Sequence, residues 1–356
     1  MNTQTPQRMG FACAYTPLPI IDAAGFVPFR VLPMGDAPDQ AGSFLHDNIC
    51  PHVKRVLDRA LGGDVPELAG VVLMNSCDAM RRVSDAWATA RPADRVITLD
   101  LPIACDDTSV AHFKAELARL MERLSEWSGR PVTVEEVVQS VDRYNALAAG
   151  LERLADYAAV GALSGGHRVL QEIFNRSVTR SVDESLTELD RLAAGQGDSQ
   201  QTDPGVPVLL FGNVLPDPEA LELLEACGCR VVADDVCTGS RQLVCYQLDG
   251  QEDPLAQLAH AILSRPACAR TLVSPQAGLL AGQVAARARE CGAKGAIAHV
   301  MKFCDPYLAR LPAIRDALRE AGLPLLVLEG DCTLRSLGQH RTRIEAFVEM
   351  LGGSPP

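Results

Sequence analysis

This 356-residue sequence is poor in aromatic residues, in positive charge and in long apolar runs. Aromatics make up 4% of the chain, and the net charge is −12, with no basic cluster to attract nucleic acid or an anionic membrane surface. No uncharged apolar run reaches the roughly 18 residues that a membrane span needs. The opening residues MNTQTPQRMG lack the charged-then-apolar order of a signal peptide. We therefore expect a cytoplasmic protein with neither nucleic acid nor a membrane as a partner.

Aliphatic residues and cysteine, by contrast, are plentiful. Ala, Leu, Val and Gly dominate, which is typical of strands and helices packed as α/β layers, and the length allows two or three domains. The chain has 12 cysteines. Because the cytoplasm is reducing, we expect a subset to serve a metal or catalysis instead of a disulfide framework. By default we interpret the following as small buried apolar residues: Cys13, Cys227, Cys229, Cys245, Cys268, Cys291 and Cys332.

One unit occurs twice in the sequence, as Gly70–Asp100 and as Ala296–Asp331. Each copy opens with a short apolar run, continues with Met-x-x-Cys-Asp and a helical pattern, and ends with a second apolar run and Asp. This order is typical of a βαβ unit with parallel strands. We therefore predict an α/β protein with two flavodoxin- or Rossmann-like domains that have short parallel sheets, are related by duplication and are accompanied by a helical middle section.

The repeated unit places a cysteine at an equivalent position in each domain. Cys77 and Cys304 follow a predicted strand and precede a predicted helix, at the sheet edge where parallel α/β proteins bind ligands. Cys50-Pro51 lies at a third predicted helix start. The positive end of a helix dipole lowers the pKa of a thiol, so all three are candidate metal-binding thiolates. Cys105, just beyond the first unit, is a possible additional ligand.

The middle of the chain is predicted to be helical. A capping box, Thr133 with Glu136, opens the amphipathic run Val132–Leu154. The polar stretch Ala194–Gly205 separates this region from a second α/β pattern. We predict three parts: an N-terminal α/β domain over residues 1–108, a helical section over 109–195 and a C-terminal α/β domain over 196–356.

A polar loop, Asp234–Arg241 (DDVCTGSR), follows the predicted strand Arg230–Ala233. Its position suits an active-site loop at the carboxyl edge of the second sheet. Asp234 or Asp235 is a candidate for orienting a proton acceptor, and Cys237 for a further ligand. Arg241 is a candidate for a phosphate contact, or for a pair with a nearby Asp. A solvated turn is the simpler alternative for the whole loop.

Together these segments resemble the 2-hydroxyacyl-CoA dehydratase family, also called the benzoyl-CoA reductase and 2-hydroxyglutaryl-CoA dehydratase D-component family. The resemblance lies in four blocks, in the same order and spread over most of the chain: YTPLPIIDAAG (Tyr15–Gly25), NSCDAMRR (Asn75–Arg82), DDVCTGSR (Asp234–Arg241) and KFCDP (Lys302–Pro306) with Gly330-Asp331. The resemblance implies an oxygen-sensitive 4Fe-4S cluster held by cysteines of three segments, which correspond to Cys50, Cys77 and Cys304. It also implies an acyl-CoA substrate.

The family chemistry explains the need for such a cluster. One electron placed on the thioester carbonyl of a 2-hydroxyacyl-CoA gives a ketyl radical anion, which expels the hydroxyl group and acidifies the β-hydrogen. The family draws this electron from a separate ATP-hydrolysing iron–sulfur activator, and its members pair with a homologous subunit. The sequence has no GxxxxGK[ST] phosphate loop, so the activator is expected to be another chain. We expect either a homologous second subunit or a homodimer.

Several alternatives stay open at this point. Cys237 as a fourth ligand would turn a substrate-binding cluster into an electron relay. The same features are consistent with a benzoyl-CoA reductase-type subunit, a double-cubane reductase subunit or a non-catalytic electron-transfer subunit. The sequence does not identify the acyl group.

Overall fold

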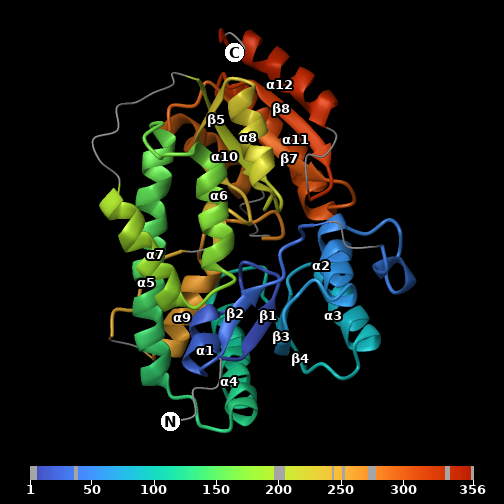
Figure 1. Ribbon diagram of the computed structural model, residues 1–356, viewed down its shortest axis with the longest axis vertical. Helices are drawn as coiled ribbons and strands as arrows, with labels where there is room; N and C mark the ends of the chain where they lie inside the picture. Colours follow the sequence, from blue (N-terminus) through green and yellow to red (C-terminus); the bar gives the residue numbers. More distant parts are fainter. Residues whose placement is uncertain are drawn as a thin grey trace.

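The computed structural model describes residues 6–35, 39–195, 205–242, 244–250, 253–271, 278–332 and 337–353. Two four-stranded parallel sheets dominate it, one in each half of the chain (Figure 1). Within the described residues no helix is both long and apolar enough to cross a membrane. The two sheets confirm the predicted α/β class with two short parallel sheets.

The first sheet has the order β2-β1-β3-β4. Its strands are β1 (Arg8–Phe11), β2 (Val27–Arg30), β3 (Leu68–Asn75) and β4 (Val96–Asp100). All neighbouring pairs are parallel. The repeated unit predicted β3 and β4, whereas β1 was not predicted from the sequence.

The second sheet repeats this topology as β6-β5-β7-β8. Its strands are β5 (Val206–Gly212), β6 (Cys229–Asp235), β7 (Gly295–Met301) and β8 (Leu325–Gly330), again all parallel. In both halves the second strand lies on one side of the first and the third strand on the other. The strand order thus reverses between β1 and β3, and between β5 and β7, and such switch points are where α/β sheets bind ligands.

Helices cover both faces of the sheets. Their bounds are α1 (Leu18–Ala23), α2 (Pro51–Leu61), α3 (Asp78–Ala90), α4 (Asp107–Ser128), α5 (Val134–Ala159), α6 (Gly166–Ser177), α7 (Val182–Gly195), α8 (Pro218–Ala226), α9 (Pro254–Leu263), α10 (Leu279–Glu290), α11 (Asp305–Glu320) and α12 (Leu337–Met350), with short 3-10 turns at Ala41–Ser43 and Ser240–Gln242. Core residues of α2 and α3 pack on one face of the first sheet, and those of α1, α4 and α5 on the other.

The helical middle section packs against the first sheet in a shared core. Thr133 and Glu136 form the predicted capping box at the start of α5. Buried residues of α9, which comes from the second half of the sequence, join this core beside α4. The chain therefore crosses back to the first half before it completes the second sheet. The three-part division of the sequence stays a prediction, and residues 196–204 of the predicted linker lie outside the described residues.

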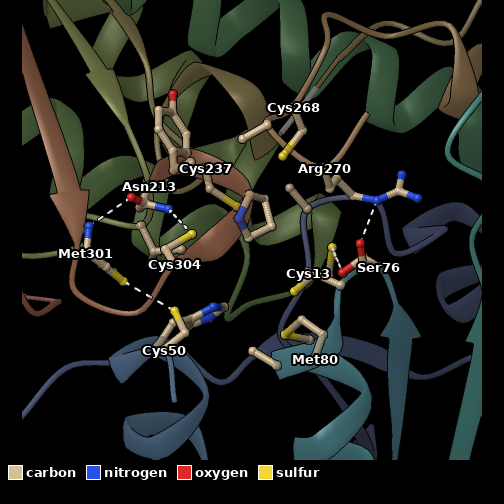
Figure 2. Close-up of a pocket in the computed structure, with 18 of the residues that line it drawn as sticks. Cys13, Cys50, Ser76, Met80, Asn213, Cys237, Cys268, Arg270, Met301 and Cys304 are labelled. Carbon is tan, nitrogen blue, oxygen red and sulfur yellow. Dashed lines mark hydrogen bonds between the residues drawn. The ribbon is translucent and has the colours of Figure 1, made fainter. Parts of the chain in front are cut away.

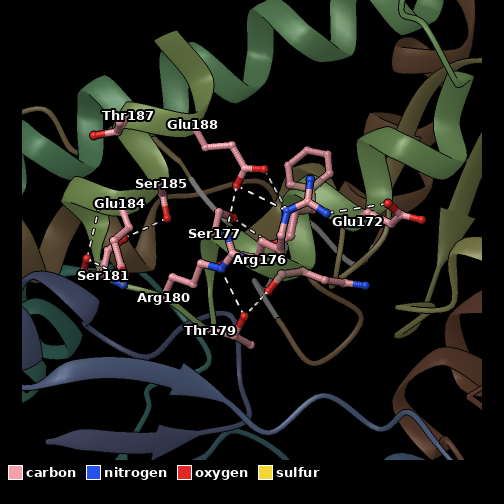
Figure 3. A network of polar contacts seen from close by, with 12 residues as sticks. Glu172, Arg176, Ser177, Thr179, Arg180, Ser181, Glu184, Ser185, Thr187 and Glu188 are labelled. Atoms are coloured by element: carbon pink, nitrogen blue, oxygen red, sulfur yellow. Dashed lines mark hydrogen bonds and ion pairs between the residues drawn. The ribbon is translucent and has the colours of Figure 1, made fainter. Parts of the chain in front are cut away.

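Charged side chains fasten α6 to α7 (Figure 3). Arg176 donates to Glu188 over 3.0 Å, and Arg180 adds a second contact to the same carboxylate over 3.3 Å. Directly after α6, the Val178 carbonyl accepts the backbone N–H of Arg30 over 2.7 Å. This contact ties the helical section to the end of β2, which borders the site described next.

Candidate active site

The carboxyl ends of the two sheets face one cavity of about 120 Å³. This is several times the space that one water molecule occupies. Figure 2 shows its walls, which come from both halves of the chain. Six cysteines line it: Cys13, Cys50, Cys77, Cys237, Cys268 and Cys304. Among the described residues, the lining includes no carboxylate but does include Arg241, Arg265 and Arg270, so the fixed charge that these residues place on the wall is positive.

Three of these cysteines are N-cap residues of helices. Cys50 precedes α2, Cys77 precedes α3 and Cys304 precedes α11, and none of the three side chains caps its own helix by a hydrogen bond. The three sulfurs are therefore left for the cavity, at the ends of helices whose dipoles favour negative charge. The sequence predicted all three helix starts.

Cys304 has the most polar surroundings of the three. Phe303, the only non-glycine residue with positive φ (57°) in the described part of the chain, makes the sharp turn that leads into it. Asn213, at the end of β5, donates from Nδ2 to the Cys304 sulfur over 3.0 Å and accepts the Met301 N–H over 2.9 Å. Donation from Cys50, from the Tyr307 backbone and from Asn213 outweighs burial and lowers the pKa of Cys304 to about 7.

The other two N-cap thiols behave differently. Donation to Cys304, together with burial, raises the pKa of Cys50, which also lies 3.9 Å from the Met301 sulfur. Burial raises the pKa of Cys77 to about 11. The expectation that a helix terminus lowers the thiol pKa is thus wrong for these two in the free protein, because donation to Cys304 holds the proton on Cys50 and desolvation penalises the thiolate of Cys77.

Cys237 reaches the cavity from the loop after β6. Its backbone N–H donates to the Asn213 carbonyl over 2.9 Å, and Arg30 donates to its sulfur over 3.1 Å. The structure thus brings all four sequence-predicted thiols to one cavity. Cys105, the possible additional ligand, is not among the lining residues, and its sulfur lies 4.0 Å from the His260 carbonyl.

Sequence reasoning missed two thiols of this cavity. Cys13 follows β1 and lies 3.6 Å from the Ser76 hydroxyl, and Cys268 follows α9. Burial raises the pKa of both. Cys13 would have been found if β1 had been recognised, because it lies two residues beyond the carboxyl end of that strand, at the sheet edge where ligands bind. Cys268 lies in a loop without a recognisable motif.

Asp235 and Arg241, two candidate active-site residues, form an ion pair with each other. The Arg241 guanidinium makes a bidentate contact with the Asp235 carboxylate, with Nη2 to Oδ2 at 2.9 Å, and also donates to the Ala267 carbonyl over 2.5 Å. Asp235 lies within β6, not in the loop as predicted. Their neighbour Asp234 accepts from Ser240 and Val236 and shapes the loop. Of the two roles considered for Arg241, a phosphate contact or an ion pair with a nearby Asp, the structure shows the ion pair.

A loop after α9 closes the cavity against the first half of the chain. Arg265 donates to the Ala14 carbonyl over 2.6 Å, and Arg270 donates to the Ser76 carbonyl over 2.6 Å (Figure 2). Both guanidinium groups lie over the ring of Tyr15, at 4.8 and 5.6 Å from its centroid. These contacts hold the two halves together around the thiols.

The donor set suits a cofactor larger than a single ion. Within the described residues no three His, Cys, Asp or Glu side chains are close enough to hold one metal ion. The thiols instead surround a common space, and soft thiolates without carboxylates are the ligands that iron–sulfur clusters prefer. The residues present therefore fit a cluster held by thiols of separate segments.

Comparison with known proteins assigns the family. Residues 13–351 match the family described as 2-hydroxyglutaryl-CoA dehydratase, D-component. The chain belongs to this D-component family. Among its relatives are the (R)-phenyllactyl-CoA dehydratase beta subunit of Clostridium sporogenes, 25% identical over 98% of this chain and 93% of that protein, and the lactoyl-CoA dehydratase subunit beta of Anaerotignum propionicum, 25% identical over 96% and 91%.

A reductase is also represented among the relatives of this D-component protein. One subunit of the benzoyl-CoA reductase of Thauera aromatica is 24% identical over 88% of this chain and 82% of its own length. The resemblance inferred from the four sequence blocks is confirmed. Since dehydratase and reductase subunits both match over most of their length, membership of the family leaves the reaction to be argued from the cavity.

Proposed function

We propose that this chain is an iron–sulfur subunit of a 2-hydroxyacyl-CoA dehydratase. The reaction removes the 2-hydroxyl group and a β-hydrogen from an (R)-2-hydroxyacyl-CoA as water, with no net oxidation. The observation that supports the proposal is the convergence of three helix N-cap thiols, Cys50, Cys77 and Cys304, on one cavity between the two sheets. These three residues would hold a 4Fe-4S cluster, and Cys237 is a candidate fourth ligand.

When bound, the cluster would supply an electron of low potential to the thioester carbonyl of the substrate. The chain itself contributes the surroundings. The dipole of α11 and the Asn213 amide, which donates to the Cys304 sulfur, favour the Cys304 thiolate. Arg265 and Arg270 fix the loop that closes the cavity, which keeps water from reactive radicals.

The proposal implies partners and a cellular location. The electron would come from a separate ATP-hydrolysing iron–sulfur activator, and the chain would assemble with a homologous second subunit or with a second copy of itself. The protein would work in the cytoplasm on an acyl-CoA. The Asp235–Arg241 pair would shape the wall of the cavity next to Cys237, since each side chain already satisfies the other.

The decisive experiment is an iron count and electron paramagnetic resonance on anaerobically purified protein. We expect about four iron atoms per chain and a large loss of iron on Cys77→Ser or Cys304→Ser. Cys291→Ser is the matched control, because Cys291 lies at the end of α10 and not among the cavity residues. Turnover is then assayed with activator, ATP and 2-hydroxyacyl-CoA, against an aromatic acyl-CoA. An iron-free parent protein would reject the proposal.

A double-cubane reductase is the second candidate, and it is favoured by the number of thiols. Six cysteines in one cavity are enough to give three ligands to each of two cubes. This candidate predicts about eight iron atoms per chain and a loss of iron on Cys13→Ser or Cys268→Ser. Four iron atoms, with both variants unchanged, would exclude it in favour of the dehydratase.

A further inference from the structure

Arg30, the last residue of β2, is a buried arginine with an unusual set of partners. Its side chain is only 1% exposed. One guanidinium nitrogen donates to the Cys237 carbonyl over 2.8 Å and to the Gln242 side-chain oxygen over 2.9 Å, and the other donates to the Cys237 sulfur over 3.1 Å. Its Nε has no hydrogen-bond partner among the described residues. In the part of the chain that the structure describes, no carboxylate pairs with this cation.

An arginine buried without a counter-charge is strongly unfavourable, because its guanidinium stays protonated and loses its hydration. Arg241 at the cavity illustrates the usual solution, since it pairs with Asp235. The groups that Arg30 contacts are two neutral oxygens and one sulfur. The sulfur of Cys237 is thus the only one of these partners that can carry, or share, a negative charge.

The contact also spans the two halves of the molecule, at the carboxyl ends of corresponding strands. Arg30 ends the second strand of the first sheet, and Cys237 follows β6, the second strand of the second sheet. A planar guanidinium binds three acceptors of one loop at fixed directions, which a lysine ammonium does less well. Arg30 therefore fixes both the backbone and the sulfur of Cys237 at the wall of the cavity.

We propose that Arg30 is a positioning residue, which holds the Cys237 sulfur toward the cavity and supplies the fixed positive charge that balances an anionic iron–sulfur group there. This inference rests on the proposed function. A cluster gains negative charge when it is reduced, so a nearby buried cation favours the reduced state, and hydrogen bonds to cluster sulfurs act in the same direction. Arg30 would thus set the reduction potential without touching the substrate.

The test compares Arg30→Gln and Arg30→Lys with the parent protein, all purified anaerobically. We expect Arg30→Gln to shift the midpoint potential to more negative values and to lower the iron content, and Arg30→Lys to restore most of the potential. Arg59→Gln is the matched control, since Arg59 is a largely buried arginine of the same half with its own carboxylate, Asp64, at 3.0 Å. Its midpoint potential should equal that of the parent.

The possible outcomes separate this inference from the proposed function. A parent that carries iron, with Arg30→Gln unchanged in iron content and midpoint potential, overturns the role of Arg30 and leaves the proposed function standing. A parent without iron overturns both.

Should Arg30→Gln not fold, melting temperatures of Cys237→Ala and of Arg30→Gln/Cys237→Ala decide the matter. We expect the double variant to melt at a higher temperature than Cys237→Ala alone, because Arg30→Gln removes a cation that has lost its sulfur partner. A further fall contradicts the inference.

Discussion

Substitution of Gly212 should be far more damaging than its small size suggests. Gly212 ends β5 with φ of +139°, a conformation that residues with a Cβ rarely adopt. An added Cβ would lie 2.0 Å from the His299 carbonyl oxygen and 2.8 Å from its carbon. Both are backbone atoms of β7, so no side chain can move aside. We therefore expect Gly212→Ala to push β5 and β7 apart at their carboxyl ends.

The magnitude follows from the contacts that would be lost. The unfavourable backbone conformation costs about 1–2 kcal/mol. Separating the strands removes the bond from the Asn213 N–H to the His299 carbonyl, now 3.0 Å, and weakens its neighbours, at about 1 kcal/mol each. The free energy of unfolding should fall by about 3 kcal/mol or more. Because Asn213 orients Cys304, iron content should fall as well.

Chemical denaturation followed by circular dichroism measures this loss. Gly292→Ala is the matched control, since Gly292 also has positive φ (67°) but no atom of the described residues within 4 Å of the added Cβ. That variant should lose only about 1 kcal/mol, from the backbone conformation alone. Equal losses in the two variants would show that the close approach of β5 to β7 is not the cause.

Three further predictions concern the thiols, the pH dependence and the helical section. Asn213→Asp removes a donor from the Cys304 sulfur and adds a negative charge, so the pKa of Cys304 should rise from about 7 to about 8. Alkylation of Cys304 in the apo protein at pH 7, measured by mass spectrometry, should then slow about fivefold, and an unchanged rate contradicts the role of this bond. Burial lowers the pKa of His299 to about 4, so between pH 6.5 and 4 the unfolded chain binds a proton that the folded chain does not. The free energy of unfolding should therefore fall by about 2 kcal/mol between pH 6.5 and 5, and His299→Phe should flatten this pH dependence. Thr133→Ala removes the capping box of α5 and should cost about 1 kcal/mol in a thermal melt, whereas a neutral result would mean that packing alone sets this helix start.

Much of the fold could be predicted because its signals are local. The repeated βαβ unit, the capping box at Thr133 and the helix starts after Cys50, Cys77 and Cys304 all follow from patterns within a few residues. β1 could not, because four residues that begin with Arg make no apolar run, and their strand exists only through pairing with β2 and β3. The place of the α9 helix in the first core likewise depends on contacts that no local pattern encodes.

The chemistry of the cavity was harder to predict for the same reason. The helix-terminus argument gave the positions of the thiols but not the pKa of Cys77, which depends on how deeply distant segments bury it. The partnership of Arg30 with Cys237 joins residues 207 apart in the sequence. A single sequence shows both residues, but it does not show that the described structure places no carboxylate beside Arg30, which is what makes its contact with Cys237 informative.

The separation of the thiols along the chain also limits when the site can form. Cys50 contacts Met301, 251 residues later in the sequence. Cys304 lies between β7 and α11, which come after α9, the helix that packs in the core of the first half. Most of the chain must therefore leave the ribosome before the cavity exists. A nascent chain would carry Cys13, Cys50 and Cys77 as separate reactive thiols, so cluster insertion belongs after synthesis, when both sheets have closed on each other.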